Sequence, residues 1–460
     1  MPDTARTGAA GITAGGEDTS AAPSMTPGLR PMDRWWLVLG SICAGALVLR
    51  VVYVFWLEHP TTIGGDAYDY HYGANLLVGG HGFIDPYAYG LVGQVHQTAQ
   101  HPPLYLLALA LPSAVGLDTF VDHQLWSCLI GTTTVAVVAL VGRRLAGARA
   151  GLIAAGLGAL YPNLWIPDGM VAAETLSLLV TAVVLLCAYR FWDRPSFRAA
   201  ALLGVSAALA GLTRAEALIL LPLILLPWLV LGRRRSARDR MAMAAVSGMA
   251  AILTLGPWVG YNMTRFDHPE LLTTGLDLAL VQANCNQVYY GPRTGYFAFT
   301  CIPSVPGHRG DESDDAAYFH RVAVDYVQAH AGRVPFVVFA RLGRTWGFYQ
   351  PLEEIRSDAY LQGWNPPAAQ TGLALYAVMV PVAIVGVVML RRRRVPLSPL
   401  VATVITVSLA TAIAFGQTRY RVTAEVSVVL LAAVGIDGLW IAGRNGTFSA
   451  WAHDDQPGGR

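Results

Sequence analysis

The sequence has no lysine, and all 32 of its basic residues are arginines. Only 13% of the 460 residues are charged, and 30 acidic residues leave a formal net charge of +2, which indicates no nucleic-acid partner. The chain also lacks a P-loop, a GxGxxG dinucleotide fingerprint, an HExxH zinc motif and a GxSxG nucleophile elbow. A cytoplasmic enzyme that uses nucleotide sugars therefore has no support.

Long apolar runs are abundant instead, with 54% hydrophobic residues and a mean hydropathy of +0.44. Runs of about 17 or more apolar residues are typical of membrane spans. The sequence predicts an all-α membrane protein with about ten spans. These are residues 35–57, 121–142, 150–166, 172–189, 199–213, 215–232, 241–262, 371–390, 397–415 and 424–443.

Arginines collect in every second connection between these spans, and the positive-inside rule places such connections in the cytoplasm. We expect a multi-pass protein of the cytoplasmic (inner) membrane with both termini inside. Residues 1–33 and 444–460 are predicted to be cytoplasmic tails, the first of them disordered. The basic connections contain Arg143, Arg144 and Arg149; Arg190, Arg194 and Arg198; Arg233, Arg234, Arg235, Arg238 and Arg240; and Arg391 to Arg394.

The opposite side of the predicted membrane gathers ionisable residues from six separate stretches of sequence. Ionisable groups at membrane depth cost a few kcal/mol each and usually mark a pathway or a site. We therefore predict a site facing outside. Its candidate residues are Asp66, Asp69, His101, Asp168, Glu174, Arg214, Glu216, Arg419, Arg421 and Glu425.

The first outer loop, residues 58–120, contains a stretch in which Asp66 and Asp69 follow two glycines. Asp66 is the candidate for a base that takes a proton from a hydroxyl, and Asp69 either supports Asp66 or binds a sugar hydroxyl. Tyr70 is a further candidate for binding the sugar. Residues 104–115 are too few to cross a bilayer and predict a helix in the outer interface. His101, just before that helix, either pairs with a phosphate or only caps the helix.

Two further polar groups have alternative interpretations. Arg419, Tyr420 and Arg421 suit a phosphate clamp, because a guanidinium fork matches phosphate oxygens in pairs. Alternatively, Arg421 pairs with Glu425 four residues on, or the group anchors a helix end. The second group comprises Glu174, Arg214 and Glu216, which either bind substrate or pair with one another as a buried network.

Residues 263–370 predict a second outer region of loops and amphipathic helices, followed by C-terminal spans in 371–443. Cys285 and Cys301 both lie within residues 263–370, and an oxidising exterior favours a disulfide between them. Ser313 is predicted to cap a helix. Arg341 and Arg344 interrupt an apolar stretch at 334–349, which predicts an interfacial helix whose arginines touch a lipid phosphate.

Four motifs follow one another in this part of the chain: Asp66 with Tyr70 and Ala74 to Leu77, then Gly-His-Gly-Phe, His-Pro-Pro-Leu-Tyr, and Tyr161-Pro162 with Glu174. Together they resemble those of the dolichyl-phosphate-mannose protein mannosyltransferase-like family of GT-C glycosyltransferases, which is related to the aminoarabinose transferases of lipid A. The resemblance covers most of residues 34–260. It implies a sugar donor carried on a polyprenyl phosphate, an active site at the first outer loop, and Asp66 as the catalytic base. His101 stands where some relatives carry a lysine near the donor phosphate.

Two functions remain open at this point. In the first, the protein transfers a hexose or pentose from a polyprenyl-phosphate donor to a hydroxyl of a glycan, lipid or protein. In the second, it transports polyprenyl lipids without chemistry, although the internal repeats typical of transporters are not evident. No cofactor is required by the motifs, and a divalent cation between Asp66 and Asp69 stays possible, although two carboxylates are a thin ligand set.

Overall fold

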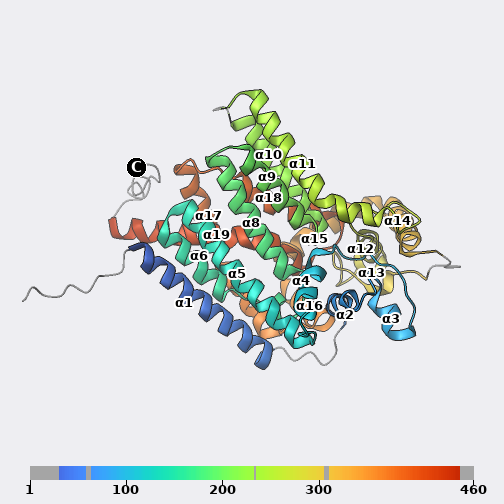
Figure 1. The fold of residues 1–460 in the computed structure, drawn as a ribbon. Helices are drawn as coiled ribbons and strands as arrows, with labels where there is room; N and C mark the ends of the chain where they lie inside the picture. Colours follow the sequence, from blue (N-terminus) through green and yellow to red (C-terminus); the bar gives the residue numbers. More distant parts are fainter. Residues whose placement is uncertain (1–30, 58–63, 233–234, 305–309, 446–460) are drawn as a thin grey trace, which may run out of the picture.

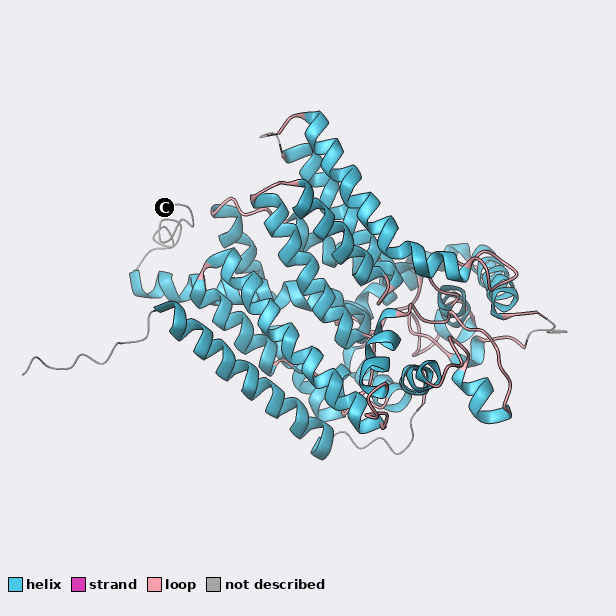
Figure 2. Ribbon diagram, in the orientation of Figure 1, coloured by secondary structure: helices cyan, strands magenta, loops and turns pink. Residues whose placement is uncertain are grey.

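The computed structural model describes residues 31–57, 64–232, 235–304 and 310–445, so most of both predicted tails lies outside the described residues (Figure 1). Within these ranges the chain is helical, and its β-structure amounts to one isolated bridge between Ile84 and Gln97 (Figure 2). The predicted all-α fold is confirmed. Its α-helices are α1 (Pro31–Val52), α2 (Asp66–Val78), α3 (Pro86–Val92), α4 (Leu104–Ser113), α5 (Phe120–Ala146), α6 (Ala148–Leu160), α7 (Ile166–Gly169), α8 (Glu174–Asp193), α9 (Phe197–Gly211), α10 (Leu220–Leu231), α11 (Ala237–Asn262), α12 (Gly275–Ala283), α13 (Asn286–Tyr289), α14 (Glu312–Ala329), α15 (Val334–Trp346), α16 (Pro351–Gln362), α17 (Pro366–Arg392), α18 (Ser398–Ile413) and α19 (Val422–Asn445).

Six stretches of helix among the described residues are long and apolar enough to cross a membrane: Arg34–Leu57, Phe120–Ala146, Glu174–Asp193, Ala237–Asn262, Pro366–Arg392 and Thr418–Arg444. The other four predicted spans coincide with shorter apolar helices, namely α6, α9, α10 with the turn before it, and α18. The chain is a multi-pass membrane protein.

Glycines let the long helices approach one another closely. A Cβ atom at Gly386 of α17 would meet the backbone of α19 at Leu431, and one at Gly435 of α19 would meet the backbone of α17 at Val382. Both contacts would be shorter than real Cβ contacts, so the two helices pack backbone to backbone. α19 also packs against α5, α6 and α8 in the largest buried apolar cluster. The start of α19, next to the 3₁₀ turn Thr418–Arg421, is therefore held firmly.

One end of the bundle carries the elements of both predicted outer regions. Figure 1 shows α2, α3, α12, α13, α14 and α16 gathered there. The expected disulfide joins Cys285 to Cys301 with 5.8 Å between their Cα atoms, and is confirmed. The prediction of Ser313 as a helix cap was wrong, because α14 begins at Glu312 and its cap is Asp311, which accepts from the Ser313 backbone N–H.

The described arginines of the basic connections lie at the other end of the bundle. α5 and α8 both begin near α2 and run away from it, and their last turns contain Arg143, Arg144 and Arg190. Some of these arginines have acidic partners: Arg144 pairs with Asp193, and Arg149 pairs with the buried Asp437. The segregation of polar groups between two ends, expected from the sequence, is thus built by the direction of the long helices.

Candidate active site

The two carboxylates of the first outer loop lie in the first turn of α2. Gly65 precedes this helix with φ of 58°, a left-handed conformation that glycine adopts easily, so the chain turns sharply before Asp66. The positive end of the helix dipole favours carboxylates at this position. The Asp66 side chain is 33% exposed and that of Asp69 is 12% exposed. Asp66 is the more accessible of the two for an incoming hydroxyl.

Arg419 connects three helices through its guanidinium group. Its Nε donates to Glu174 of α8 at 2.8 Å, and its Nη1 donates to the Gln362 side chain of α16 at 2.8 Å. Its Nη2 donates to Asp66 Oδ2. The 3₁₀ turn before α19 thus presents Arg419 directly to the predicted base.

Arg214 extends the same network. Its Nη1 donates to Glu174 Oε1 at 2.6 Å and its Nε donates to Glu216 Oε1 at 2.6 Å. The ring of Tyr420 lies 4.7 Å from the Arg214 guanidinium carbon. Glu174 Oε1 therefore accepts from two arginines, while its Oε2 is buried with no hydrogen-bond partner among the described residues. The buried network that the sequence allowed is present, and Arg419 joins it to Asp66.

His101 lies on the other side of the two carboxylates. Its Nε2 is 3.5 Å from Asp69 Oδ2 and 3.9 Å from Asp66 Oδ1. The neighbouring Gln100 donates to Asp69 Oδ2 at 3.4 Å. Tyr70 is buried, and its ring centroid lies 4.8 Å from that of His101. Tyr70 therefore supports the imidazole and is not open to solvent.

The second outer region holds the segment that carries Gln100 and His101. The backbone N–H of Ala99 donates to Glu312 Oε2 at 2.9 Å, and Thr273 Oγ1 donates to the Gln100 carbonyl at 2.5 Å. Arg265 donates to the Thr98 carbonyl at 2.7 Å. These contacts come from parts of the chain more than 160 residues away in sequence. Part of the wall of the candidate site is therefore fixed by Arg265, Thr273 and Glu312.

The surroundings shift the pKa values of the two aspartates in opposite directions. Burial opposes ionisation of Asp66, but Arg419 and His101 outweigh it and lower the pKa of Asp66 below its usual value. Burial raises the pKa of Asp69, although the nearby His101 imidazole opposes this rise. The carboxylates in turn raise the pKa of His101 against the effect of its burial. Pairs of groups whose pKa values are driven apart are characteristic of acid–base sites.

Arg421 points away from this cluster. Its Nε donates to Glu425 Oε1 at 2.6 Å and its Nη1 donates to the Thr345 carbonyl at 3.0 Å, and its guanidinium carbon lies 3.6 Å from the Tyr376 ring centroid. Arg421 and Glu425 are each 1% exposed, and Tyr161 also donates to Glu425. This is the pairing that the sequence offered as the structural alternative to a phosphate clamp.

A family model matches part of this sequence, and solved structures share its fold. The sequence model of the family described as dolichyl-phosphate-mannose-protein mannosyltransferase matches residues 100–260, about a third of the chain. The archaeal oligosaccharyltransferase AglB from Archaeoglobus fulgidus, solved in complex with an inhibitory peptide and a dolichol-phosphate, superposes with a TM-score of 0.53 at 15% sequence identity, over 92% of this chain and 54% of AglB. The protein has a GT-C fold. The family resemblance expected from the sequence is confirmed.

Two further solved structures complete the comparison of the GT-C fold. The Archaeoglobus fulgidus oligosaccharyltransferase in complex with Zn and sulfate has a TM-score of 0.51 at 16% identity, over 89% of this chain and 50% of the other. ArnT from Cupriavidus metallidurans bound to undecaprenyl phosphate has a TM-score of 0.39 at 15% identity, over 89% of this chain and 80% of ArnT. The chain spans about half the length of the oligosaccharyltransferase. No curated protein matches it by sequence.

Sequence reasoning missed several polar partners in this GT-C chain. Arg50 lies inside the first apolar run, and its Nε donates to Asp168 Oδ2 at 2.8 Å, with both side chains 1% exposed. Asp168 is therefore paired inside the bundle and does not reach the Asp66 cluster. Gln100 and Gln362 also went unnoticed. Gln100 lies in a polar loop and Gln362 at the end of α16, and a single glutamine gives no pattern of its own in either place, so nothing short of the fold singles them out.

The two arginines of α15 have protein partners. Arg341 donates to the carbonyls of Ala412, Ile413 and Ala283 and to Asn284. Arg344 pairs with Glu354 at 3.0 Å, and both side chains are 1% exposed. Neither arginine faces outward, so the expectation that they touch a lipid phosphate was wrong. The outward face of α15 carries phenylalanines instead: Phe336 and Phe339.

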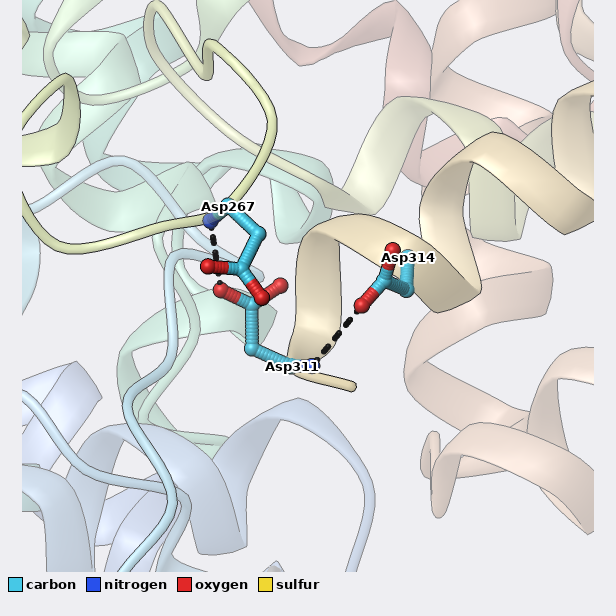
Figure 3. A group of neighbouring side chains, drawn as sticks. All are labelled: Asp267, Asp311 and Asp314. Atoms are coloured by element: carbon cyan, nitrogen blue, oxygen red, sulfur yellow. Dashed lines mark hydrogen bonds between the residues drawn. The ribbon is translucent and has the colours of Figure 1, made fainter. Parts of the chain in front are cut away.

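Three acidic residues of the outer region lie close enough to hold a metal ion: Asp267, Asp311 and Asp314 (Figure 3). Asp311 accepts from the Asp267 backbone N–H, and its own N–H donates to Asp314, so these carboxylates cap the start of α14. His268 also contacts Asp314, at 3.0 Å. At the other acidic pair, Arg419 and His101 lie against Asp66 and Asp69, which makes that pair a poor ligand set for a divalent cation.

Proposed function

We propose that this protein is a membrane glycosyltransferase that moves a sugar from a polyprenyl-phosphate donor to a hydroxyl of a glycan, glycolipid or protein at the outer face of the cytoplasmic membrane. One observation carries the proposal: the arginine next to the start of the last helix reaches the carboxylate at the start of α2. This brings a candidate base and a candidate phosphate ligand within hydrogen-bond distance. AglB, which has the same fold, was solved with a dolichol-phosphate, which supports a lipid-phosphate donor.

The reaction needs a base on the acceptor and positive charge on the leaving group. Asp66 takes the proton of the acceptor hydroxyl while the oxygen of that hydroxyl forms a bond to the anomeric carbon of the sugar. The bond from that carbon to the phosphate oxygen breaks, and the polyprenyl phosphate leaves as an anion. Arg419 and a protonated His101 stabilise the charge that develops on the phosphate.

The ion pair between Asp66 and Arg419 makes Asp66 a weak base before substrate binds. A donor phosphate competes with Asp66 for the same guanidinium. When Arg419 donates to the phosphate in place of Asp66, the Asp66 carboxylate loses its cationic partner and becomes more basic. Donor binding therefore prepares the base, and the acceptor reacts after the donor is in place.

The test is sugar transfer from a radiolabelled polyprenyl-phosphate sugar in membranes that contain matched amounts of each variant. Asp66→Asn should lose transfer by a factor of about 100 or more while it still binds donor. The control is Asp325→Asn on α14, where the carboxylate is exposed and remote in the sequence from the cluster, and it should transfer at the wild-type rate. Donor binding without transfer by the wild type, over a panel of hydroxyl acceptors, would favour a polyprenyl-lipid transporter instead.

A further inference from the structure

α16 lies beside the turn that carries Arg419 and presents three polar side chains to it. Glu354, Asp358 and Gln362 are spaced by four residues, so they fall on one face of the helix. The other face of α16 is open to solvent, where Tyr360 is 84% exposed. The helix therefore has one polar face turned into the protein, which is the reverse of an ordinary surface helix.

Each of these side chains holds one of three consecutive residues before α19. Glu354 Oε1 accepts from the backbone N–H of Thr418 at 3.2 Å. Asp358 Oδ1 accepts from the side chain of Gln417 at 2.8 Å. Gln362 Oε1 accepts from Arg419 Nη1 at 2.8 Å. Three side chains of α16 thus fix three consecutive residues of the turn that carries Arg419.

The two carboxylates of this face are themselves anchored. Glu354 accepts from Arg344 at 3.0 Å, and Asp358 accepts from the Tyr296 hydroxyl at 2.8 Å. Both carboxylates are 1% exposed. Apolar side chains of similar volume would fill this space without the cost of removing two carboxylates from water. Their presence is explained by what they hold, which is the backbone and side chains around Arg419.

We propose that α16 positions Arg419 for sugar transfer, with Gln362 as the positioning residue that fixes the guanidinium plane and with Asp358 and Glu354 fixing the turn behind it. This inference rests on the proposed function. A guanidinium binds phosphate oxygens through a rigid planar fork, so its orientation decides whether both bonds form. A displacement of about 1 Å in such a group can reduce the rate about 100-fold.

The experiment compares Gln362→Leu, which removes the acceptor oxygen, with Gln362→Glu, which keeps it. Transfer from a radiolabelled polyprenyl-phosphate sugar and thermal unfolding are measured on the full-length protein. Gln362→Leu should lower kcat by a factor of about 10 to 100 with an unchanged Tm, and Gln362→Glu should restore most of it. Tyr360→Ala, on the exposed face of the same helix, is the matched control and should leave both values unchanged.

The outcomes separate this inference from the proposed function. Wild-type protein that transfers no sugar would overturn the proposed function, and the positioning role would fall with it. An active wild type with Gln362→Leu equally active would overturn the positioning role alone. A parallel fall of kcat and Tm in Gln362→Leu, or no rescue by Gln362→Glu, would also count against positioning, because a merely structural residue behaves in that way.

Discussion

Arg419 and Arg421 are two residues apart in the same turn, yet their acidic partners differ in exposure to solvent. Arg419 lies in a network whose carboxylate Asp66 is 33% exposed, whereas Arg421 and its partner Glu425 are each 1% exposed. An ion pair with an accessible member can exchange partners with a substrate. A pair sealed on all sides cannot, and there the charges balance each other inside the bundle. Accessibility, and not the presence of paired charges, separates the candidate site from the scaffold.

The largest effect is expected from breaking the sealed pair. Arg421→Gln leaves Glu425 buried without its cation, and loss of one member of a buried pair costs about 3 to 5 kcal/mol of stability. Thermal or denaturant unfolding in detergent would measure this loss. The double variant Arg421→Met with Glu425→Met should be more stable than Arg421→Gln, because no lone charge remains. Wild-type stability in Arg421→Gln would contradict the assignment of a structural role.

A smaller effect on free energy, but a specific one on the reaction, is expected at the accessible arginine. On the proposed function, Arg419→Gln removes a donor to the leaving phosphate, and the loss of such a donor lowers kcat by about 100-fold or more. Its stability should stay close to that of the wild type, since Arg214 still neutralises Glu174. Transfer assays with an unfolding control measure both quantities. Similar stability losses in Arg419→Gln and Arg421→Gln would erase the distinction drawn between them.

The smallest effect concerns pH at His101. Asp69 and Asp66 raise the pKa of this imidazole, so its contribution to stability is complete below the unfolded pKa of about 6.5 and is lost as the pH rises through the folded pKa. It also requires an ionised Asp69, whose pKa is raised. We expect the free energy of unfolding of the wild type to exceed that of His101→Gln by about 0.5 kcal/mol at pH values between the pKa of Asp69 and the folded pKa of His101. Unfolding at a series of pH values tests this, and a difference that grows in alkali would contradict it.

The sequence was most informative where a physical rule acts locally. Long apolar runs and arginine-rich turns predicted the spans, and the ionisable residues at their far ends predicted most members of the Asp66 cluster. Spacing of four residues offered the Arg421 and Glu425 pair, but gave no reason to separate Arg421 from Arg419. That separation depends on the side of the 3₁₀ turn from which each side chain leaves, which becomes evident in the folded chain.

The rest depends on contacts between distant segments. Arg50 was hidden in an apolar run because its partner Asp168 comes 118 residues later. Gln362 was hidden because one face of α16 meets a turn near the end of the chain. Neither pairing follows from periodicity or composition, since both arise from helix packing. A polar residue in an apolar run therefore predicts that a partner exists, without telling which residue it is.

The hydrogen bond between Arg419 and Asp66 joins residues that are 353 positions apart. During synthesis, α2 leaves the ribosome long before the turn at 418–421. The nascent chain therefore has its carboxylates in place for most of its translation while the guanidinium that completes the cluster does not yet exist. On the proposed function, transfer activity begins with the insertion of α19, and a chain truncated before α19 should be inactive however well its earlier helices insert.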